Sequence, residues 1–241
     1  MRHAGRVTAT AGAAVPPPGE ALPATGGRLP GWWRDFAPLT LTPVLAGALG
    51  AFTEQGFHGS SVRDIARRAG VTVPALYYHH PSKQAMLVAL LEGTVLDMLD
   101  RVRAAVAEAG PAPRAGVAAF AEAAVLYMTH RVGSAALDGQ LRYLDPEGRV
   151  RYAASRKRVE ELLVGIVEAG HADGSLVLDH PRDTARALLG MYQAVAHWYR
   201  PDGALSPEEL AARYVAISLR AVGAGRTGGA GRTGGGGSMG P

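Results

Sequence analysis

Apolar residues recur every three to four positions along most of the chain, and no stretch sustains the alternation typical of a β-strand. An early helix is expected to begin at Thr42-Pro43, a polar cap followed by a first-turn proline, and to stop at Gly56. Glycines and prolines divide the rest into longer helical segments, which fall near 82–109, 112–131, 147–170, 181–200 and 206–222. The pattern therefore predicts an all-α protein.

The stretch that begins at Ser61 carries the pattern of two short helices joined by a tight turn. Ser61 is placed to cap the first helix, with Asp64 three positions later in a capping-box-like start. Gly70 is placed to end that helix in the left-handed conformation. Thr72 is expected to cap the second helix, and Leu76 is spaced to close the small core between the two. Together these features predict a helix-turn-helix.

The second helix of such a motif lies in the major groove of DNA, with its first residues nearest the base edges. A hydroxyl can hydrogen-bond there, and small apolar groups suit a thymine methyl, while basic and hydroxyl groups grip phosphates. The residues expected to contact DNA are Ser61, Arg63, Thr72, Val73, Pro74, Ala75, Tyr77, Tyr78 and Lys83. No Arg or Asn stands at the tip for bidentate base reading, so specificity is expected to depend on Tyr78, Arg63 and DNA shape.

The charge of this segment is basic, because Arg63, Arg67, Arg68 and Lys83 oppose the single acid Asp64. Two interpretations are open for Arg67 and Arg68: they contact phosphates, or they face away from DNA as part of a solvated basic surface. The whole chain carries a formal charge of +4, which weakly favours a polyanionic partner.

Enzymatic and metal-binding sites are not expected. The chain has no cysteine, which excludes a disulfide scaffold, a thiol nucleophile and a Cys-ligated metal. It also lacks a phosphate-binding glycine loop, a nucleophile elbow and a helical pair of histidine ligands, so no cofactor is expected. No apolar run is long enough to cross a bilayer, and no convincing signal peptide is present, which favours a cytoplasmic protein.

Four motifs together resemble the DNA-binding domain of TetR-family regulators over about residues 42–95: FTEQGF from Phe52, VRDIA from Val62, GV from Gly70 and LYYHHPSK from Leu76. The resemblance implies that Tyr77 and Lys83 grip phosphates and that residues 72–75 enter the groove. His80 departs from the family, which usually has Phe at that position. It is either a buried spacer against the following helix or a proton switch.

A single helix-turn-helix makes few DNA contacts, so a homodimer is expected. The last two long helices have broad apolar faces, formed by Ala185, Leu188, Leu189, Tyr192, Val195, Ala196 and Tyr199 on one and Leu210, Tyr214, Ile217 and Val222 on the other. These faces form either a four-helix interface between subunits or ordinary intramolecular core. The resemblance favours the dimer.

Met and aromatic residues of the middle helices can line an adaptable apolar pocket or belong to plain core. The resemblance implies a ligand cavity, for which we select Phe120, Tyr127, Met128, Tyr152, Met191 and Trp198. Residues 196–210 resemble the C-terminal part of a subgroup that regulates fatty-acid and sterol catabolism, which implies a small hydrophobic effector such as an acyl-CoA thioester.

The expected organisation has four parts: a disordered arm (1–38), a helix-turn-helix domain (39–88), a helical ligand-binding and dimerisation domain (89–222) and a disordered Gly-rich tail (223–241). In the arm, Trp32 and Trp33 either pack on the first helix or belong to a segment that reaches a DNA groove. We expect the protein to be a repressor that binds operator DNA and that an effector releases from the DNA. The alternative is a basic helical scaffold for protein partners, without sequence-specific DNA binding.

Overall fold

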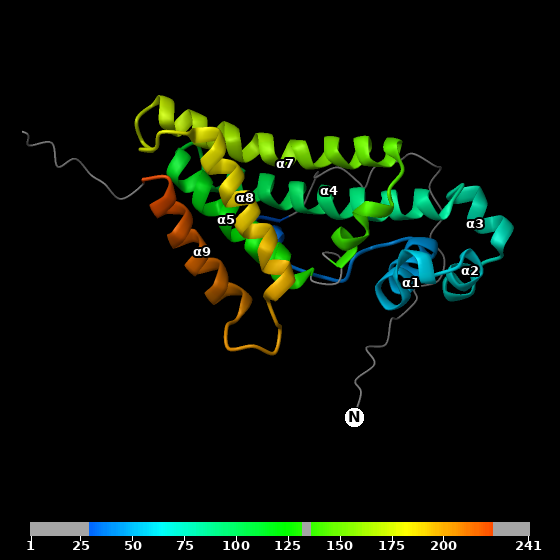
Figure 1. Ribbon diagram of the computed structural model, residues 1–241. Helices are drawn as coiled ribbons and strands as arrows, with labels where there is room; N and C mark the ends of the chain where they lie inside the picture. Colours follow the sequence, from blue (N-terminus) through cyan, green and yellow to red (C-terminus); the bar gives the residue numbers. More distant parts are fainter. Residues whose placement is uncertain (1–28, 132–135, 224–241) are drawn as a thin grey trace, which may run out of the picture.

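The computed structural model describes residues 29–131 and 136–223. Within these ranges the protein has eight α-helices, two 3-10 segments and no strand, so the predicted all-α class is confirmed (Figure 1). Most of the N-terminal arm and nearly all of the Gly-rich tail expected from the sequence lie outside the described residues. No helix in the described part is long and apolar enough to span a membrane.

The first three helices form a small unit that we call the reader: α1 (Pro43–Gly59), α2 (Val62–Ala69) and α3 (Val73–His79). Thr42 caps α1 by accepting a hydrogen bond from the backbone N–H of Leu45, as the sequence predicts. The long helix α4 (Lys83–Ala109) then runs from the reader into the rest of the molecule (Figure 1).

The regular part of α1 ends at the predicted glycine. Gly56 has φ 73° and ψ 170°, a conformation that a side chain disfavours, and it kinks the chain before the last turn reaches Gly59. This kink turns Phe57 back toward the core, where the residue is buried. The prediction placed the break correctly but did not foresee the extra turn.

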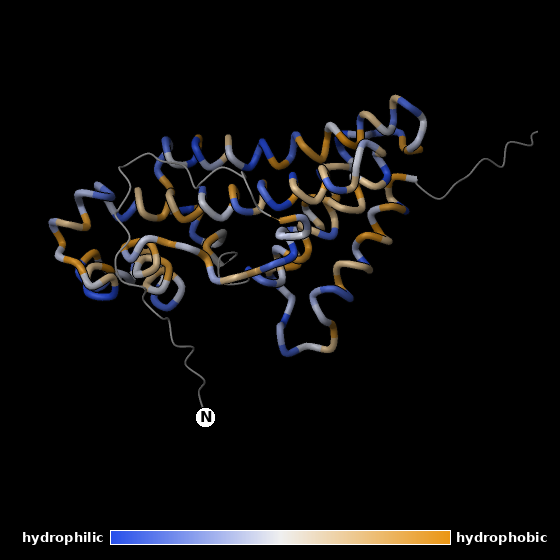
Figure 2. Tube along the Cα trace, turned by 180° about the vertical axis from the view of Figure 1, so that it is seen from behind, coloured by the Kyte–Doolittle hydropathy of each residue, from blue (hydrophilic) through white to orange (hydrophobic). Residues whose placement is uncertain are grey.

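The remaining helices form a bundle with α4: α5 (Pro113–His130), α7 (Pro146–Ala172), α8 (Pro181–Trp198) and α9 (Pro207–Ala221). All four lie within about two residues of the predicted segments. Helix α5 is central, since it packs against α4, α7, α8 and α9 and most of its residues from Gly116 onward are buried. Hydrophobic positions recur along α4 and α5, whereas α7 has long hydrophilic stretches (Figure 2).

A 3-10 segment, η2 (Ala136–Tyr143), joins the bundle to the reader and was not predicted. Its Leu137, together with Leu144 and Tyr152, belongs to the same buried cluster as the reader core. The ring of Tyr143 stacks on Phe57 with centroids 5.6 Å apart. The described residues thus form two buried clusters, and the one that holds the reader core also includes side chains from η2 and α7.

The arm expected at residues 1–38 departs from the prediction from Leu29 onward. A 3-10 turn, η1 (Trp32–Arg34), lies against α4 and α5. Trp33 is only 2% exposed, and its indole N–H donates to Glu108 of α4 at 2.8 Å. The tryptophan pair thus packs on the bundle. The first of the two sequence interpretations, that the pair packs on α1, is therefore wrong. We call residues 29–41 the strap.

Candidate DNA-binding surface and effector cavity

The helix-turn-helix forms as its local sequence predicts. Ser61 accepts a hydrogen bond from the N–H of Asp64 at 3.1 Å, and Thr72 accepts one from Ala75 at 3.3 Å. Gly70 ends α2 in the left-handed conformation, with φ 67° and ψ 29°. Leu76 is fully buried in the core of the reader, where it fixes α3 against the other two helices.

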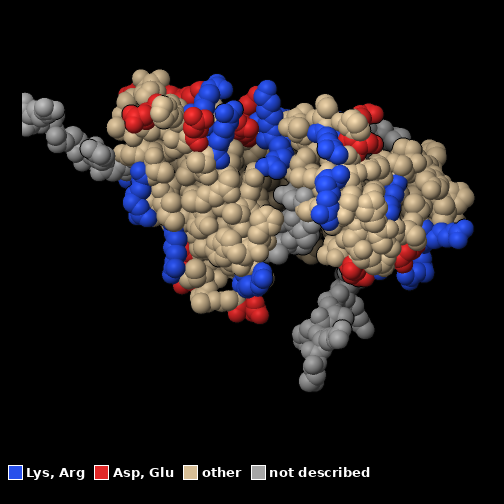
Figure 3. All heavy atoms as spheres, viewed as in Figure 1, with Lys and Arg blue, Asp and Glu red and all other residues tan. Residues whose placement is uncertain are grey.

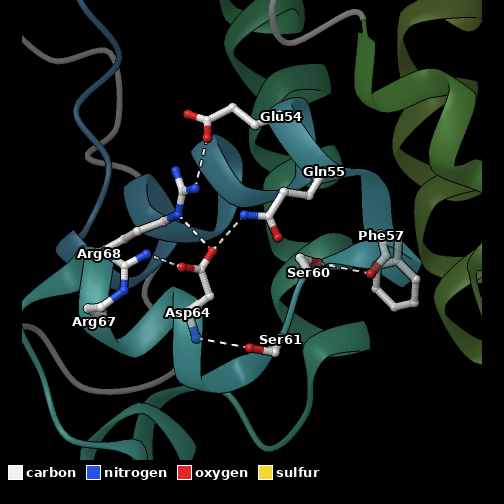
Figure 4. Close-up of polar contacts among 8 residues, drawn as sticks. All are labelled: Glu54, Gln55, Phe57, Ser60, Ser61, Asp64, Arg67 and Arg68. Carbon is white, nitrogen blue, oxygen red and sulfur yellow. Dashed lines mark hydrogen bonds and ion pairs between the residues drawn. The ribbon is translucent and has the colours of Figure 1, made fainter.

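The carboxylate of Asp64 has a different role from the one expected. It does not return to the backbone of Ser61; it accepts hydrogen bonds from Gln55 of α1 at 3.1 Å and from Arg67 and Arg68 of its own helix (Figure 4). The hydrogen bond from Arg68, followed by that from Arg67, holds the pKa of Asp64 below its usual range. This network joins α1 to α2, and only the Ser61 half of the predicted capping box is formed.

The network favours the second of the two interpretations of the arginine pair, a solvated basic surface. Arg68 donates to Asp64 and to Glu54 of α1, both at 2.8 Å, and Arg67 pairs with Asp64. These contacts belong to the solvated surface of the reader and neutralise much of its charge. Arg63 is exposed and forms no ion pair with any described residue.

The exposed face of α3 presents most of the predicted DNA contacts together. Thr72, Pro74 and Ala75 are exposed at its start, and Tyr77 and Tyr78 are 46% and 76% exposed further along. Two exposed tyrosines on a helix of seven residues are unusual for a face without a partner, because large aromatic side chains are normally buried. Lys and Arg gather around α2 beside this face, and also along α7 (Figure 3).

Two residues selected for DNA binding make contacts within the reader. Val73 is half-buried and packs against the reader core, because the first turn of α3 presents that position inward. The ammonium of Lys83 donates to the carbonyls of Phe57 and Ser60, the latter at 2.8 Å. Burial lowers the pKa of Lys83. No local sequence signal indicated either contact, because both depend on the packing of α1.

His80 ends α3 and is half-buried. Burial, and secondarily the charge of His79, lowers the pKa of its imidazole, so the neutral form is favoured in the folded protein. The placement agrees with the interpretation of His80 as a spacer beside the following helix.

A cavity of about 240 Å³ lies among α4, α5, α7 and α8. Its apolar wall includes Val95 and Met98 of α4 and Leu189 of α8, and Arg156, Glu160 and Arg186 add charge. Arg186 donates to Glu160 at 2.8 Å. Arg156 forms no ion pair with any described residue and lies near the ring of Tyr152, 5.9 Å from its centroid. The site therefore combines an apolar interior with one unpaired cation.

Half of the predicted pocket residues line this cavity: Tyr127, Met128 and Tyr152. The other three do not. Phe120 is fully buried two turns before Tyr127 in α5, where it packs near Tyr192; Met191 packs on the bundle core; and Trp198, at the end of α8, is 47% exposed. Arg156 and Arg186 were not predicted from the sequence; for Arg156 the available signal was its place one turn after Tyr152 in the same helix.

The residues proposed for the dimer seam are mostly intramolecular core. Tyr192 of α8 is fully buried and shares a 2.8 Å hydrogen bond with Ser218 of α9, and burial raises its pKa to about 12. The other buried members are Ala185, Leu188, Leu189, Val195, Tyr199, Leu210 and Val222. Of the residues proposed for the seam, Ile217 is exposed on the outward face of α9, and the outward face of α8 presents Ala187, Ala194 and Trp198, which were not in the proposed set.

Two family descriptions match consecutive parts of the chain. Residues 44–90 match "Bacterial regulatory proteins, tetR family", and residues 110–222 match "Tetracyclin repressor-like, C-terminal domain". The first match covers the reader and the start of α4, and the second covers α5 to α9. The matches agree with a helix-turn-helix followed by a C-terminal helical domain.

Among characterised proteins, the HTH-type transcriptional repressor KstR2 of Rhodococcus jostii is 30% identical over 181 residues, which cover 74% of this chain and 88% of KstR2. The crystal structure of the TetR-family regulator PfmR from Thermus thermophilus superposes with a TM-score of 0.63 at 31% identity and covers 73% of this chain and 97% of PfmR. AibR in complex with isovaleryl coenzyme A and operator DNA has the same fold, with a TM-score of 0.64 at 23% identity and coverage of 72% and 95%.

These relatives are transcriptional regulators and not enzymes, and they support a ligand-responsive repressor that binds DNA. The scaffold interpretation without sequence-specific DNA binding has no support among them. With the exposed α3 face and the cavity in the bundle, the matches show that this chain belongs to the TetR family of bacterial transcriptional regulators.

Proposed function

We propose that the protein represses transcription as a homodimer that inserts α3 of each protomer into the major groove of an operator in the bacterial cytoplasm. The observation that carries this proposal is the exposure of Thr72, Pro74, Ala75 and Tyr78 on one rigid helix. The hydroxyls and small apolar groups of this face suit base edges and thymine methyls. Arg63 of α2 and Tyr77 of α3 are exposed, and we assign both to phosphate contacts, although Arg63 was expected from the sequence to contribute to specificity.

The effector that fits the cavity has an apolar body and an anionic group. Val95, Met98 and Leu189 suit the body, and the unpaired guanidinium of Arg156 suits the anion. Arg186 is less available because Glu160 already accepts from it. An acyl-CoA thioester meets both requirements, and a relative with the same fold was crystallised with isovaleryl coenzyme A. We therefore propose an acyl-CoA thioester as the effector.

The operator is released through α4, because this helix connects the cavity to the reader. Thr94, Val95 and Met98 stand in the cavity wall, and Lys83 at the other end of the helix holds the reader. An effector that prefers a displaced α4 changes the position of the reader in each protomer, and with it the spacing of the two α3 helices. The loss of operator affinity equals the preference of the effector for that conformation.

The dimer is proposed to form through the outward faces of α8 and α9. Ala187, Ala194 and Trp198 are exposed along α8, and Ile217 is 39% exposed on α9. Small residues let two helices approach closely, and the exposed Trp and Ile provide apolar area to bury. Two helices from each protomer would then form a four-helix interface.

The test of DNA recognition is selection of duplexes from a random library by the purified protein, followed by competition between the selected duplex and a scrambled one. Tyr78→Ala is expected to reduce the preference for the selected duplex by about 10-fold, in line with the loss of one base contact. Tyr78→Phe retains the ring and is expected to retain most of the preference. Equal binding of selected and scrambled duplexes by the wild-type protein would refute operator recognition.

The test of the effector is titration of the protein–operator complex with lauroyl-CoA, free CoA and laurate. Lauroyl-CoA is expected to release the operator, and Arg156→Ala is expected to raise the required concentration about 10-fold, because a charge-assisted contact is lost. Arg158→Ala is the matched control, since Arg158 is exposed on the same helix and does not line the cavity. An operator complex that is insensitive to lauroyl-CoA rules out this effector class.

The test of the dimer is the mass of the protein in solution by light scattering. Ala194→Glu and Ile217→Glu each introduce a charge into the proposed seam and are expected to yield monomers. Val150→Glu is the control, because Val150 is 70% exposed on α7, away from the seam. Dimers that persist in both seam variants would place the interface elsewhere.

A further inference from the structure

The backbone of the strap is held by two arginines of the bundle, one buried and one partly buried. Arg101 of α4 is 5% exposed and donates to the carbonyls of Trp33 at 3.0 Å and Asp35 at 2.9 Å. Arg131, at the end of α5, donates to the carbonyl of Ala37 at 2.8 Å. Burying a guanidinium is costly unless its donors are satisfied, so these carbonyls are required partners of the arginines.

A shared acid links the two arginines. Asp97 of α4 accepts a hydrogen bond from Arg101 at 3.0 Å, and its other oxygen lies 3.6 Å from the Nε atom of Arg131. The side chains of all three residues are at most 15% exposed. The strap therefore lies across a buried charged cluster that spans α4 and α5.

Side chains of the strap complete the docking. The ring of Phe36 stacks on His130 of α5 with centroids 4.2 Å apart and an interplanar angle of 8°, and the guanidinium of Arg101 lies 4.2 Å from the same ring. The two oxygens of Glu108 accept from the indole N–H of Trp33 and from the N–H of Gly31, each at 2.8 Å. The strap thus contacts both helices through packing as well as polar bonds.

The helices that hold the strap are also walls of the cavity. Met98 lines the cavity and stands three residues before Arg101 in α4, and Met128 lines it three residues before Arg131 in α5. Positions three apart are neighbours on a helix surface. Any change in the separation of α4 and α5 around a cavity occupant therefore reaches the residues that grip the strap.

The strap leads directly into the reader. Only residues 38–42 separate Ala37, the last residue gripped by the bundle, from the start of α1. Five residues of extended chain span at most roughly 17 Å, so this connection, which we call the leash, is short. At its other end the reader continues into α4 after His79. Both ends of the reader are therefore anchored on the bundle.

We propose that the strap is a further tether, beside α4 and the contacts of η2 with α1, that restricts the orientation of the reader and carries displacements of α4 and α5 to α1. Its consequence for operator binding depends on the function proposed above, whereas the restriction of orientation does not. A reader held at both ends presents α3 at a defined position, and a dimer of such protomers accepts a narrow range of half-site spacings.

The tether is tested by slackening it while the strap stays docked. Insertion of Gly-Ser-Gly-Ser between Pro38 and Leu39 lengthens the leash without removing any contact of Trp33 or Phe36. The control carries the same insertion between Gly26 and Gly27, ahead of the strap. Thermal unfolding is expected to be the same for both proteins, because neither insertion removes a buried side chain.

The orientation of the reader is measured between spin labels at Ala75→Cys and Ala153→Cys, both exposed positions, in a chain without other cysteines. Labelled protein is diluted with unlabelled protein so that distances within one protomer dominate. The insertion at residue 38 is expected to broaden the narrow distance peak, because the contacts of α1 with α4 and η2 remain, and the control insertion is expected to leave its width unchanged. An unchanged peak after the insertion at residue 38 overturns the tether.

The consequence for DNA is measured with the selected operator and with duplexes whose half-sites are moved apart by one and two base pairs. The slackened protein is expected to discriminate between spacings about five-fold less than the control, at the lower end of measured coupling between sites. An unchanged spacing preference overturns the role of the tether in DNA binding. If the wild-type protein prefers no duplex at all, the proposed function fails, and the spin-label distances alone decide the tether.

Discussion

The ammonium nitrogen of Lys83 lies 2.8 Å from the carbonyl oxygen of Ser60, so the first residue of α4 holds the residue that ends α1. The same ammonium donates to Phe57 and lies 4.4 Å from the centroid of its ring. A lysine has three N–H donors, and two are already used inside the protein. The relationship makes Lys83 a structural clamp of the reader, whatever contact its third donor makes.

Replacement of Lys83 by Met is expected to destabilise the protein. Methionine retains the apolar stem but leaves two carbonyls of a partly buried turn without their donor, so the free energy of unfolding is expected to fall by about 1.5 kcal/mol. Urea denaturation followed by circular dichroism measures this loss. Lys157→Met is the control, because Lys157 is exposed and its contact with Glu161, at 3.5 Å, is a surface ion pair. Equal stability of both variants would leave the clamp without support.

Arg63 and Arg67 lie on the same helix, but Arg63 has no ion pair with a described residue, whereas Arg67 is paired with Asp64. Comparing the two tests which arginine contacts DNA. Arg63→Ala is expected to weaken binding to every duplex alike and to reduce the slope of log affinity against log salt by about one, because one phosphate contact is lost. Arg67→Ala is expected to change the slope less, since Arg67 pairs with Asp64. Fluorescence anisotropy at several salt concentrations measures both slopes. A larger change for Arg67 would show that its ion pair opens on DNA.

Local sequence signals, such as caps and glycines, were sufficient to predict the helix-turn-helix. They did not predict contacts between residues that are far apart in the sequence. Gly70 and the caps at Ser61 and Thr72 act within four residues, so their roles could be predicted from the sequence alone. The strap depends on bonds such as Arg101 to Trp33 and Arg131 to Ala37, whose partners are 68 and 94 residues apart. No periodicity in the proline- and glycine-containing arm indicates such partners.

The same limit applies to the cavity. Tyr127 and Phe120 both lie on α5, seven residues apart. This spacing does not determine which neighbouring helix each of them contacts. Tyr127 lines the cavity, whereas Phe120 packs near Tyr192 of α8. Helix-to-helix packing decides between these positions, and an amphipathic pattern in a helix buried on most sides does not reveal it.

Gly47 provides a test of the crossing between α1 and α2. A Cβ at this position would lie 3.0 Å from the carbonyl oxygen of Ile65 and 3.2 Å from the backbone nitrogen of Ala69. Backbone atoms of a packed helix cannot easily move away, so Gly47→Ala is expected to cost about 1–3 kcal/mol of stability despite the better helix propensity of alanine. Thermal unfolding measures the loss.

Gly93 is the matched control for Gly47, because it also lies within a helix but a Cβ there would meet no atom within 4 Å. Gly93→Ala is expected to stabilise the protein by up to about 1 kcal/mol through helix propensity alone. If both substitutions stabilise the protein, a Cβ at position 47 fits between α1 and α2. Gly47 would then not be required for the crossing of these two helices.

His80 gives the stability of the protein a pH dependence whose sign follows from its environment. Its pKa is lowered in the folded state by burial and by His79, so the unfolded chain binds the proton more readily than the folded one. The contribution of neutral His80 is therefore fully present above the ordinary histidine pKa of about 6.5, and it is lost as the pH falls below that value through the folded-state pKa.

His80→Phe removes this titration while keeping an aromatic ring at the end of α3. The difference in unfolding free energy between His80→Phe and the wild-type protein is expected to grow in favour of the variant as the pH falls from 7 toward 5, since only the wild-type protein must bury a group that tends to bind a proton. Urea denaturation at a series of pH values measures the difference. His171→Phe, at an exposed position on α7, is the control for replacing an imidazole by a phenyl ring at the surface. A difference for His80→Phe that stays constant over this pH range would mean that the imidazole of His80 is equally free to protonate in both states. The interpretation of His80 as a buried neutral spacer would then be wrong.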